Sequence, residues 1–394
     1  MRTLSKAQTN GKQNGGEFLF FRTLHNASFS NLEVAERQRI AFESDTLPTN
    51  NLVLIIDESI RSDHLSINGY ARPTTPYLHT ISDKGYLYNW GTAVAGGSCS
   101  MISNPLLITG IPVTENARLF ADEYSVLSIK LRRLKQQSES APPLVDLTPT
   151  LFDYAKAMGY RTHYLDTQTR YLWNGLGLRD LDFIDHWLTI DDFGDDVDSD
   201  FRAADYIYQT VKSSNGNFIL LNKRGVHFRY DESFPADQMI WSPPPPKWDY
   251  REYPEFGINV YDSGIRYNVN TFFQRMLPDF ETLENTIFIY TSDHGQTLFE
   301  DGLQWPHCGA TNKEAMVPLL LIGDVEQTLD TQFPASHSNI FSSFLDLMAV
   351  PEAVRAYPYA PSLLTARADS RADRLFLTGV FSIINFDDTV SPQN

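Results

Sequence analysis

The chain has 394 residues, of which 42% are hydrophobic and 13% aromatic, so it can bury a sizeable core and is not disordered as a whole. Its formal net charge of −17 argues against a nucleic-acid partner, because neutralising phosphates requires a basic surface. No segment approaches the ~18–20 apolar residues of a membrane helix, and the N-terminus lacks a signal-peptide core, so the chain is either a soluble protein or the extramembrane part of a longer one.

The chain divides into a polar N-terminal part and one main domain. Residues 1–44 are predicted to form a flexible tail, followed from residue 17 by a linker helix with an apolar pattern. Residues 45–394 are predicted to form a single α/β domain. One domain of this size is acceptable because large α/β enzymes often exceed the ~100–200 residues that are usual for a domain.

Strands and helices alternate along the main domain. Near-continuous apolar runs are typical of parallel strands that are covered on both faces, and they predict strands at Leu52–Ile56, Arg161–Leu165, Phe218–Leu221, Thr286–Tyr290, Met316–Ile322 and Leu375–Ile384. Helical patterns lie at Pro76–Lys84, Thr148–Met158, Phe201–Lys212, Tyr261–Leu277 and Asn339–Met348. This alternation predicts a mostly parallel central sheet with helices on both faces.

Two stretches interrupt the alternation. Ten aspartates fall within Asp180–Asp205, which we interpret as a solvated acidic loop because their spacing does not match a calcium-binding loop. Residues 228–256 are rich in proline, and the four prolines Pro243–Pro246 exclude a central strand. This insertion is either an ordered lid over a site or an ordinary surface excursion.

Carboxylate and imidazole side chains follow three of the predicted strands. Glu58 ends the first apolar run, His227 follows the run at 217–222, and Asp293 with His294 ends the run at 285–292. In open α/β sheets ligands bind beyond the carboxyl ends of the strands. Glu58, Asp293 and His294 can therefore share one cation, either zinc or manganese, which leaves a coordination position open.

Ser100 is the candidate nucleophile. It follows a Gly-Gly turn and precedes a helix-compatible run, so its hydroxyl is expected at a helix N-terminus, where negative charge is favoured by ~0.3–1 kcal/mol. Metal coordination has the larger effect, because zinc lowers the pKa of bound water from 15.7 to about 7. We therefore also count Ser100 among the metal-binding residues.

Two loop histidines are candidates for contact with the substrate. His227 in KRGVHF and His307 in QWPHCG each follow one of the key segments, where an imidazole can contact a phosphate or act as a general acid. The remaining histidines lack such a context and are interpreted as structural: His25, His64, His79, His163, His186 and His337.

The chain has two cysteines, so no disulfide framework is implied. Cys99 precedes Ser100, and Cys308 follows His307. If Ser100 and His307 face the same metal, the two sulfurs can lie within the distance that a disulfide requires. The alternative is two independent buried thiols.

The motifs resemble those of one enzyme family. Glu58 in NLVLIIDESIRSDHLSINGYARPTTPYL, Ser100 in GGSCSMISNP, and TSDHGQTLFEDG followed by His307 resemble the catalytic domain of the phosphoethanolamine transferases, which belong to the alkaline phosphatase and sulfatase superfamily. The resemblance runs from about residue 50 to about residue 325, and residues 110–215 contribute little to it.

The resemblance implies a sulfatase-like catalytic domain at 45–394 and a specific reaction. It implies that Glu58, Asp293 and His294 bind Zn²⁺ and that Ser100 accepts the phosphoryl group. It also implies that His227 and His307 bind the phosphate or the incoming substrate. Phosphatidylethanolamine would donate phosphoethanolamine, diacylglycerol would leave, and a hydroxyl of lipid A, a glycan or another envelope molecule would accept it. The expected location is the periplasmic face of the inner membrane, at the membrane surface, as the soluble domain of a membrane-anchored protein.

The sequence departs from the family at several points, and other readings stay open. Ser100 stands where these transferases usually have Thr, VHFRY replaces the usual His-Gly-Pro, and the family's multiple disulfides and membrane bundle are absent. The main alternative is a metal-dependent phosphodiesterase or phosphatase of the same superfamily. A sulfatase would need a Cys/Ser-x-Pro-x-Arg motif, which Ser100 lacks, and a binding domain with a degenerate site is the reading outside enzymes.

Overall fold

The computed structural model describes residues 36–115, 147–172, 175–244, 250–303, 305–370, 374–379 and 382–389. The predicted tail and most of the linker helix lie outside these residues. The predicted helix is wrong for its last part, because residues 36–44 contain no helix. Instead, the Arg37 side chain is buried and donates to the Asp180 carboxylate over 2.7 Å, a contact that ties this segment to the domain.

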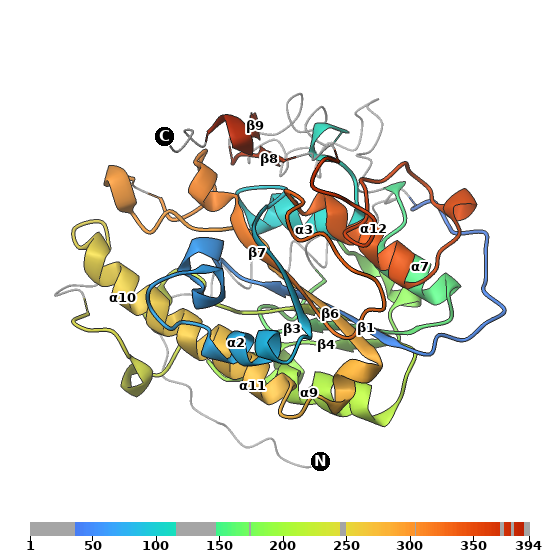
Figure 1. The fold of residues 1–394 in the computed structure, drawn as a ribbon, viewed down its shortest axis with the longest axis horizontal. Coiled ribbons are helices and arrows are strands. Elements are labelled where there is room, and N and C mark those ends of the chain that lie inside the picture. Colours follow the sequence, from blue (N-terminus) through green and yellow to red (C-terminus); the bar gives the residue numbers. More distant parts are fainter. Residues whose placement is uncertain are drawn as a thin grey trace, which may run out of the picture. The chain divides into compact units, whose positions relative to one another are not determined.

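A mostly parallel sheet forms the centre of the domain, as predicted, and it has seven strands (Figure 1). Its spatial order is β2-β7-β6-β1-β5-β3-β4, and β7 is antiparallel to both neighbours whereas the other pairs are parallel. The strands are β1 (Asn51–Asp57), β2 (Leu87–Val94), β3 (Arg161–Asp166), β4 (His186–Leu188), β5 (Asn217–Asn222), β6 (Thr286–Ser292) and β7 (Met316–Ile322).

Helices cover both faces of this sheet, and the central strand β1 shows why its sequence is apolar throughout. Leu52, Leu54 and Ile56 belong to one hydrophobic cluster, whereas Val53 and Ile55 belong to another. The first cluster also contains buried side chains of three helices, α3 (Ser100–Thr109), α7 (Leu151–Ala157) and α12 (Ser338–Leu347). The second includes α2 (Pro76–Asp83), α9 (Ser199–Ser213), α10 (Pro254–Ile265) and α11 (Phe272–Met276), which Figure 1 shows on the opposite side of the sheet.

Three predicted elements differ in the structure. The acidic stretch is not a simple solvated loop, since it contains β4, the short helix α8 (Ile190–Phe193) and the start of α9. The predicted helix at Tyr261–Leu277 is interrupted by a π-helical segment at Arg266–Thr271. The predicted late strand is two short antiparallel strands, β8 (Leu375–Leu377) and β9 (Ile383–Asn385).

The proline-rich insertion is ordered in its described parts by aromatic packing. The Phe228 ring lies 5.5 Å from the Tyr250 ring and 5.6 Å from the Phe299 ring, measured between centroids. Phe299 belongs to the segment that follows His294, so this packing joins the insertion to the loop after β6. Residues 245–249, which include half of the proline run, lie outside the described residues.

Candidate metal centre and nucleophile

The ends of two paired strands bring three metal-type side chains together. β1 and β6 run in parallel with Asp57 opposite Ser292, so the residues that follow them meet at the same edge of the sheet. Glu58, Asp293 and His294 each offer one ligand atom, and these atoms all lie within 4.8 Å of one another. All three side chains are about 1% exposed. The structure therefore assembles the predicted cluster at the predicted edge.

The electrostatics of the cluster are those of a site built for a cation. Asp293 Oδ2 is buried and has no hydrogen-bond partner, which is costly for a carboxylate oxygen. Burial, and after it the neighbouring Glu58 carboxylate, raise the pKa of Asp293 to about 6. Burial opposes the charged form of His294, but Asp293 and Glu58 outweigh it, so the pKa of His294 is raised. A cation would relieve the repulsion between the two carboxylates.

The surrounding hydrogen bonds orient the candidate ligands. His294 Nδ1 donates to the Gly295 carbonyl over 2.7 Å, which leaves Nε2 as the free ring nitrogen. This nitrogen lies 3.6 Å from Glu58 Oε1 and 3.5 Å from Asp293 Oδ2. Ser59 donates from its backbone N–H to Asp293 Oδ1 and from its hydroxyl to Glu58 Oε1. Such outer contacts are typical of metal sites, where they fix the ligand geometry, and two carboxylates with one imidazole suit zinc or manganese.

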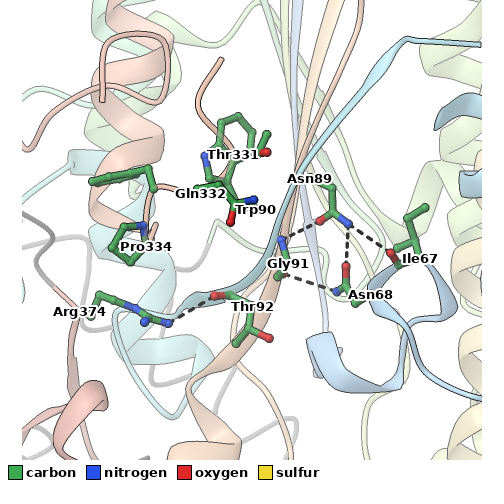
Figure 2. Close-up of a pocket in the computed structure, with 11 residues that line it drawn as sticks. Ile67, Asn68, Asn89, Trp90, Gly91, Thr92, Thr331, Gln332, Pro334 and Arg374 are labelled. Carbon is green, nitrogen blue, oxygen red and sulfur yellow. Dashed lines mark hydrogen bonds between the residues drawn. The ribbon is translucent and has the colours of Figure 1, made fainter. Parts of the chain in front are cut away.

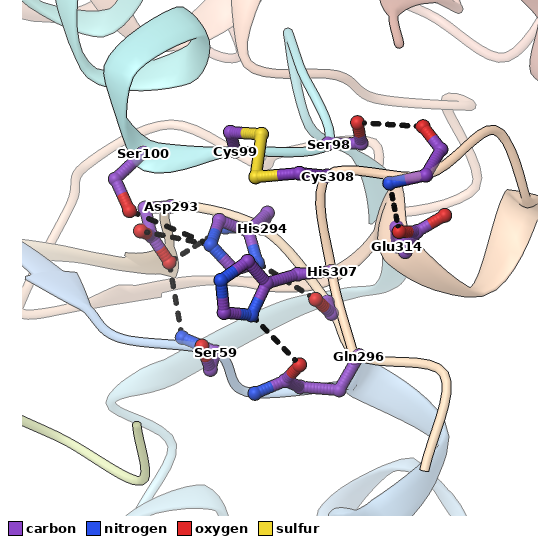
Figure 3. The surroundings of a disulfide bond; sticks show 12 residues. Ser59, Ser98, Cys99, Ser100, Asp293, His294, Gln296, His307, Cys308 and Glu314 are labelled. Carbon is purple, nitrogen blue, oxygen red and sulfur yellow. Dashed lines mark hydrogen bonds and ion pairs between the residues drawn. A yellow bond between two sulfur atoms is a disulfide. The ribbon is translucent and has the colours of Figure 1, made fainter. Parts of the chain in front are cut away.

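Ser100 is the first residue of α3, and its hydroxyl lies against the same cluster (Figure 3). Ser100 Oγ is 3.5 Å from Glu58 Oε2 and 3.4 Å from His294 Nε2. The preceding turn needs small residues, because a Cβ on Gly97 would come within 2.5 Å of the Ile102 side chain. The Gly-Gly turn thus lets α3 begin close to the strand ends, and this brings the Ser100 hydroxyl against the cluster.

His227 and His307 lie beside the cluster. The His307 ring centroid is 4.9 Å from that of His294 and 5.6 Å from that of His227. Burial, and after it the nearby His294 and His227, lower the pKa of His307 to about 3. Burial also lowers the pKa of His227. Both imidazoles are therefore neutral at pH 7 and able to donate one N–H each to an anionic group.

Sequence reasoning missed two groups that support Glu58. Gln168 follows β3, and its Nε2 donates to Glu58 Oε2 over 3.1 Å and to the Lys223 carbonyl over 2.6 Å. Lys223 follows β5; it is fully buried and donates to Asp57 Oδ2 over 2.5 Å, while Asp57 Oδ1 accepts from the Glu58 backbone N–H over 2.9 Å. The rule that ligands gather at strand ends also applied to these residues, but an amide and a lysine do not suggest metal ligation.

A disulfide joins the two segments that carry Ser100 and His307. Cys99 and Cys308 are bonded, with their Cα atoms 4.9 Å apart. The hypothesis of a disulfide is therefore confirmed, and that of two independent thiols is wrong. Because the two cysteines flank the candidate nucleophile and a candidate substrate-binding histidine, the bond lies at the rim of the cluster (Figure 3).

A separate hollow of about 440 Å³ lies along the edge strand β2, around Trp90, Gly91 and Thr92 (Figure 2). Its rim includes Arg374, which donates to the Thr92 carbonyl over 3.4 Å. The hollow is lined by none of the predicted site residues. The buried carboxylates, the imidazole and the Ser100 hydroxyl converge at the strand ends instead.

The fold and the cluster together define a class of protein. The sequence model of the family described as Sulfatase matches residues 50–350, and the chain belongs to this family. It has the alkaline-phosphatase-like and sulfatase-like fold that the sequence predicted.

Within this class, the chain is similar to phosphoethanolamine transferases. It is 22% identical over 270 residues to phosphoethanolamine transferase EptC from Escherichia coli O18:K1:H7, an alignment that covers 63% of this chain and 40% of that protein. It is 24% identical over 254 residues to the Kdo(2)-lipid A phosphoethanolamine 7''-transferase of E. coli K12, covering 63% of this chain and 39% of that protein. The alignments thus span about two fifths of the length of these relatives.

Solved structures agree with the fold. The C-terminal periplasmic domain of EptC from E. coli superposes with a TM-score of 0.67 at 18% identity, covering 90% of this chain and 97% of that domain. The same domain has been solved in complex with zinc. Within the part of this chain that the structure describes, no helix combines the length and the apolar character needed to cross a membrane.

Proposed function

We propose that this chain is the catalytic part, at residues 45–394, of a zinc-dependent phosphoethanolamine transferase. It would move phosphoethanolamine from phosphatidylethanolamine to an acceptor hydroxyl through a phosphoserine at Ser100. The observation that carries the proposal is the position of the Ser100 hydroxyl, 3.4–3.5 Å from two members of the buried Glu58, Asp293 and His294 cluster.

The cluster suits zinc, with manganese as an alternative. Its donors are two carboxylates and His294 Nε2, which faces them while Nδ1 is bonded to the Gly295 carbonyl. Asp293 Oδ2, which accepts no hydrogen bond, can coordinate a cation. When bound, zinc supplies positive charge that lowers the pKa of a coordinated hydroxyl and stabilises phosphoryl oxygens.

In the proposed reaction, Ser100 is the nucleophile and the two histidines bind the phosphoryl group. Ser100 Oγ attacks the phosphorus of the donor, so the Oγ–P bond forms, the bond to the diacylglycerol oxygen breaks, and that oxygen takes up a proton. His227 and His307, neutral and close to the cluster, donate N–H groups to the phosphoryl oxygens. In the second half, an acceptor hydroxyl attacks the phosphorus and Ser100 is released with its proton. Two steps with one nucleophile split a difficult transfer into easier ones.

The proposed location is the periplasmic face of the inner membrane, as part of a membrane-anchored protein. The Cys99–Cys308 disulfide supports an oxidising compartment. The similarity to a domain described as periplasmic supports the same location. A relative described as acting on Kdo(2)-lipid A supports a glycolipid or another envelope molecule as the acceptor.

Intact-protein mass spectrometry tests this proposal. Zinc-loaded protein is incubated with phosphatidylethanolamine vesicles without acceptor, with Ser100→Ala as the matched control. We expect a mass increase of one phosphoethanolamine in the wild type and none in the variant. An unmodified wild-type protein that releases free phosphoethanolamine would instead favour the phosphodiesterase alternative, and no reaction in a zinc-loaded protein would overturn the proposed donor.

A further inference from the structure

We infer that the Cys99–Cys308 disulfide is a positioning element of the reaction, beyond any contribution to stability. It holds His307 in place relative to Ser100, so breaking it lowers turnover while the metal-binding cluster stays assembled. This inference rests on the proposed function for the roles of Ser100 and His307, which lie immediately beside the two cysteines in the sequence.

The bond is part of a short bridge between two loops. The Cys308 backbone N–H donates to the Ser98 carbonyl over 2.8 Å. The Ser98 hydroxyl donates to the Gly309 carbonyl over 2.9 Å. With the disulfide at its centre, this bridge fixes the residue before the nucleophile to the residue after the histidine (Figure 3).

The Ser100 side of the bridge is anchored independently of the bond. Ser100 begins a ten-residue helix whose Ile102 and Leu106 are buried. Behind that helix start, His337 Nδ1 accepts from the Ser103 hydroxyl over 3.0 Å and from the Gly96 N–H over 3.2 Å. The nucleophile should therefore keep its place when the disulfide is opened.

The His307 side depends more on the bond, although the Thr297 N–H also donates to the Pro306 carbonyl and the Thr297 hydroxyl to the Trp305 carbonyl. Residues 305–311 contain neither helix nor strand in the described part, and Trp305 is 69% exposed. The His307 side chain has a long contact of 3.3 Å between Nδ1 and Gln296 Oε1. Beyond Cys308 the loop is fastened again, because the Gly309 and Thr311 N–H groups donate to the Glu314 carboxylate. Opening the disulfide is thus expected to displace His307 locally and not to unfold the loop.

The metal-binding cluster does not rely on this bridge. Glu58, Asp293 and His294 follow paired strands, and the hydrogen bonds that orient them include those with Ser59, Gln168 and the Gly295 carbonyl, which lie outside the bridge. Metal affinity should therefore survive the loss of the disulfide. A displacement of about 1 Å in a catalytic group can cost about 100-fold in rate, so turnover is expected to fall about 10–100-fold.

A double-mutant cycle tests the inference, with Cys99→Ser/Cys308→Ser, His307→Ala and their combination compared at a temperature where all four proteins are folded. We expect the cysteine variant to bind zinc as tightly as the wild type in chelator competition but to turn over about 10–100-fold more slowly. In the His307→Ala background the cysteine changes should add little, because both act through the same imidazole. Full turnover in the cysteine variant, or a loss that simply multiplies with that of His307→Ala, would overturn the inference.

Chemical reduction of the disulfide provides a second test of the inference. A phosphine reductant breaks the S–S bond, giving two thiols, while the phosphine is oxidised and takes its oxygen from water. A phosphine is preferable to a dithiol, which can remove zinc by chelation. The cysteine variant, which has no disulfide to open, controls for effects of the reductant elsewhere. Only the wild type should slow on reduction.

A readout without turnover separates this inference from the proposed function. If the wild type forms no phosphoethanolamine adduct, the proposed function fails, and amide hydrogen exchange still decides the role of the bridge. Reduction should speed exchange in residues 305–309 and leave β6 unchanged. Unchanged exchange at residues 305–309 would show that the disulfide does not hold His307, whatever the substrate.

Discussion

Asp293 is the side chain of the site whose burial is most unfavourable electrostatically. Its Oδ2 is buried without a hydrogen-bond partner, and the Glu58 and His294 side chains lie beside it. A buried carboxylate oxygen without a hydrogen-bond donor is costly, and a bound cation would offset that cost. The metal-free protein should therefore carry a pH-dependent instability that zinc removes.

The pH dependence of the metal-free protein follows from the raised pKa of Asp293, about 6 in the fold against ~3.9 in a free chain. Between these values the folded state binds more protons than the unfolded chain, so stability falls as the pH rises from about 4 to about 6. Two pKa units correspond to roughly 3 kcal/mol. The raised pKa of His294 acts in the same direction.

Urea unfolding of metal-free protein at pH 5 and pH 7 measures this effect. The wild type should be less stable at pH 7, and Asp293→Asn should reduce that difference, because the amide does not titrate. The same variant should bind zinc far more weakly, measured by metal content after dialysis. An equal pH slope in wild type and variant would show that Asp293 is not the titrating group.

Gln168 is the residue whose role the sequence concealed most fully. Its amide donates to the oxygen of Glu58 that also faces Ser100, so it fixes the carboxylate on the side of the candidate nucleophile. Gln168→Met keeps the length of the side chain and removes the donor. Loss of a hydrogen bond to a metal ligand typically costs 10–100-fold in metal affinity, and we expect a loss of that size for zinc in chelator competition. An unaltered affinity for zinc would show that the hydrogen bond from Gln168 does not support metal binding.

At the scale of elements, the start of α3 depends on the absence of a side chain. A Cβ on Gly97 would lie 2.5 Å from Ile102 Cγ2 and 2.7 Å from its Cβ. Gly97→Ala should therefore push the first turn of α3 away from the strand ends, destabilise the protein by about 1–3 kcal/mol and lower turnover by displacing Ser100.

The matched control is Gly177→Ala. Gly177 has a φ of −148°, and a Cβ there would meet nothing within 4 Å. This variant should keep the stability and turnover of the wild type in thermal unfolding and activity measurements. Equal behaviour of the two variants would show that space before α3 is not what the glycine provides.

The sequence predicted some elements correctly and others wrongly, depending on whether local or distant contacts determine them. The central strands were predictable because β1, β5 and β6 are apolar on both faces, and the cluster followed because acids and a histidine stand just past their ends. Residues 36–44 were mispredicted because Arg37 is fixed by Asp180, 143 residues away, and a local pattern does not contain that contact.

The acidic stretch was misread for a similar reason. Asp200 is buried because the backbone N–H groups of Arg224 and Gly225 and the Thr167 hydroxyl donate to it. These donors come from loops after two other strands, so charge density alone could not separate Asp200 from its exposed neighbours. The same limit hid Gln168, whose partner Glu58 lies 110 residues earlier.

At the scale of the whole molecule, a buried lysine connects the sheet to its helical layer. Lys223 Nζ contacts Asp57 Oδ2 at 2.5 Å and the Asn268 carbonyl at 3.0 Å, and it lies 4.3 Å from the centre of the Phe272 ring. Through Asp57, the same lysine supports the backbone of Glu58. The packing of the sheet against its helices and the arrangement of the candidate metal-binding residues are therefore linked.

Replacing this lysine tests the linkage. Lys223→Met should destabilise the protein by about 3–5 kcal/mol, because it leaves the buried Asp57 without its cation. Burial already raises the pKa of Asp57 against the opposing effect of Lys223, so the variant should recover stability as the pH falls and Asp57 is protonated. Adding Asp57→Asn should restore much of the loss at pH 7, measured by urea unfolding. A double variant no more stable than Lys223→Met would mean that lost packing, and not the unpaired carboxylate, causes the damage.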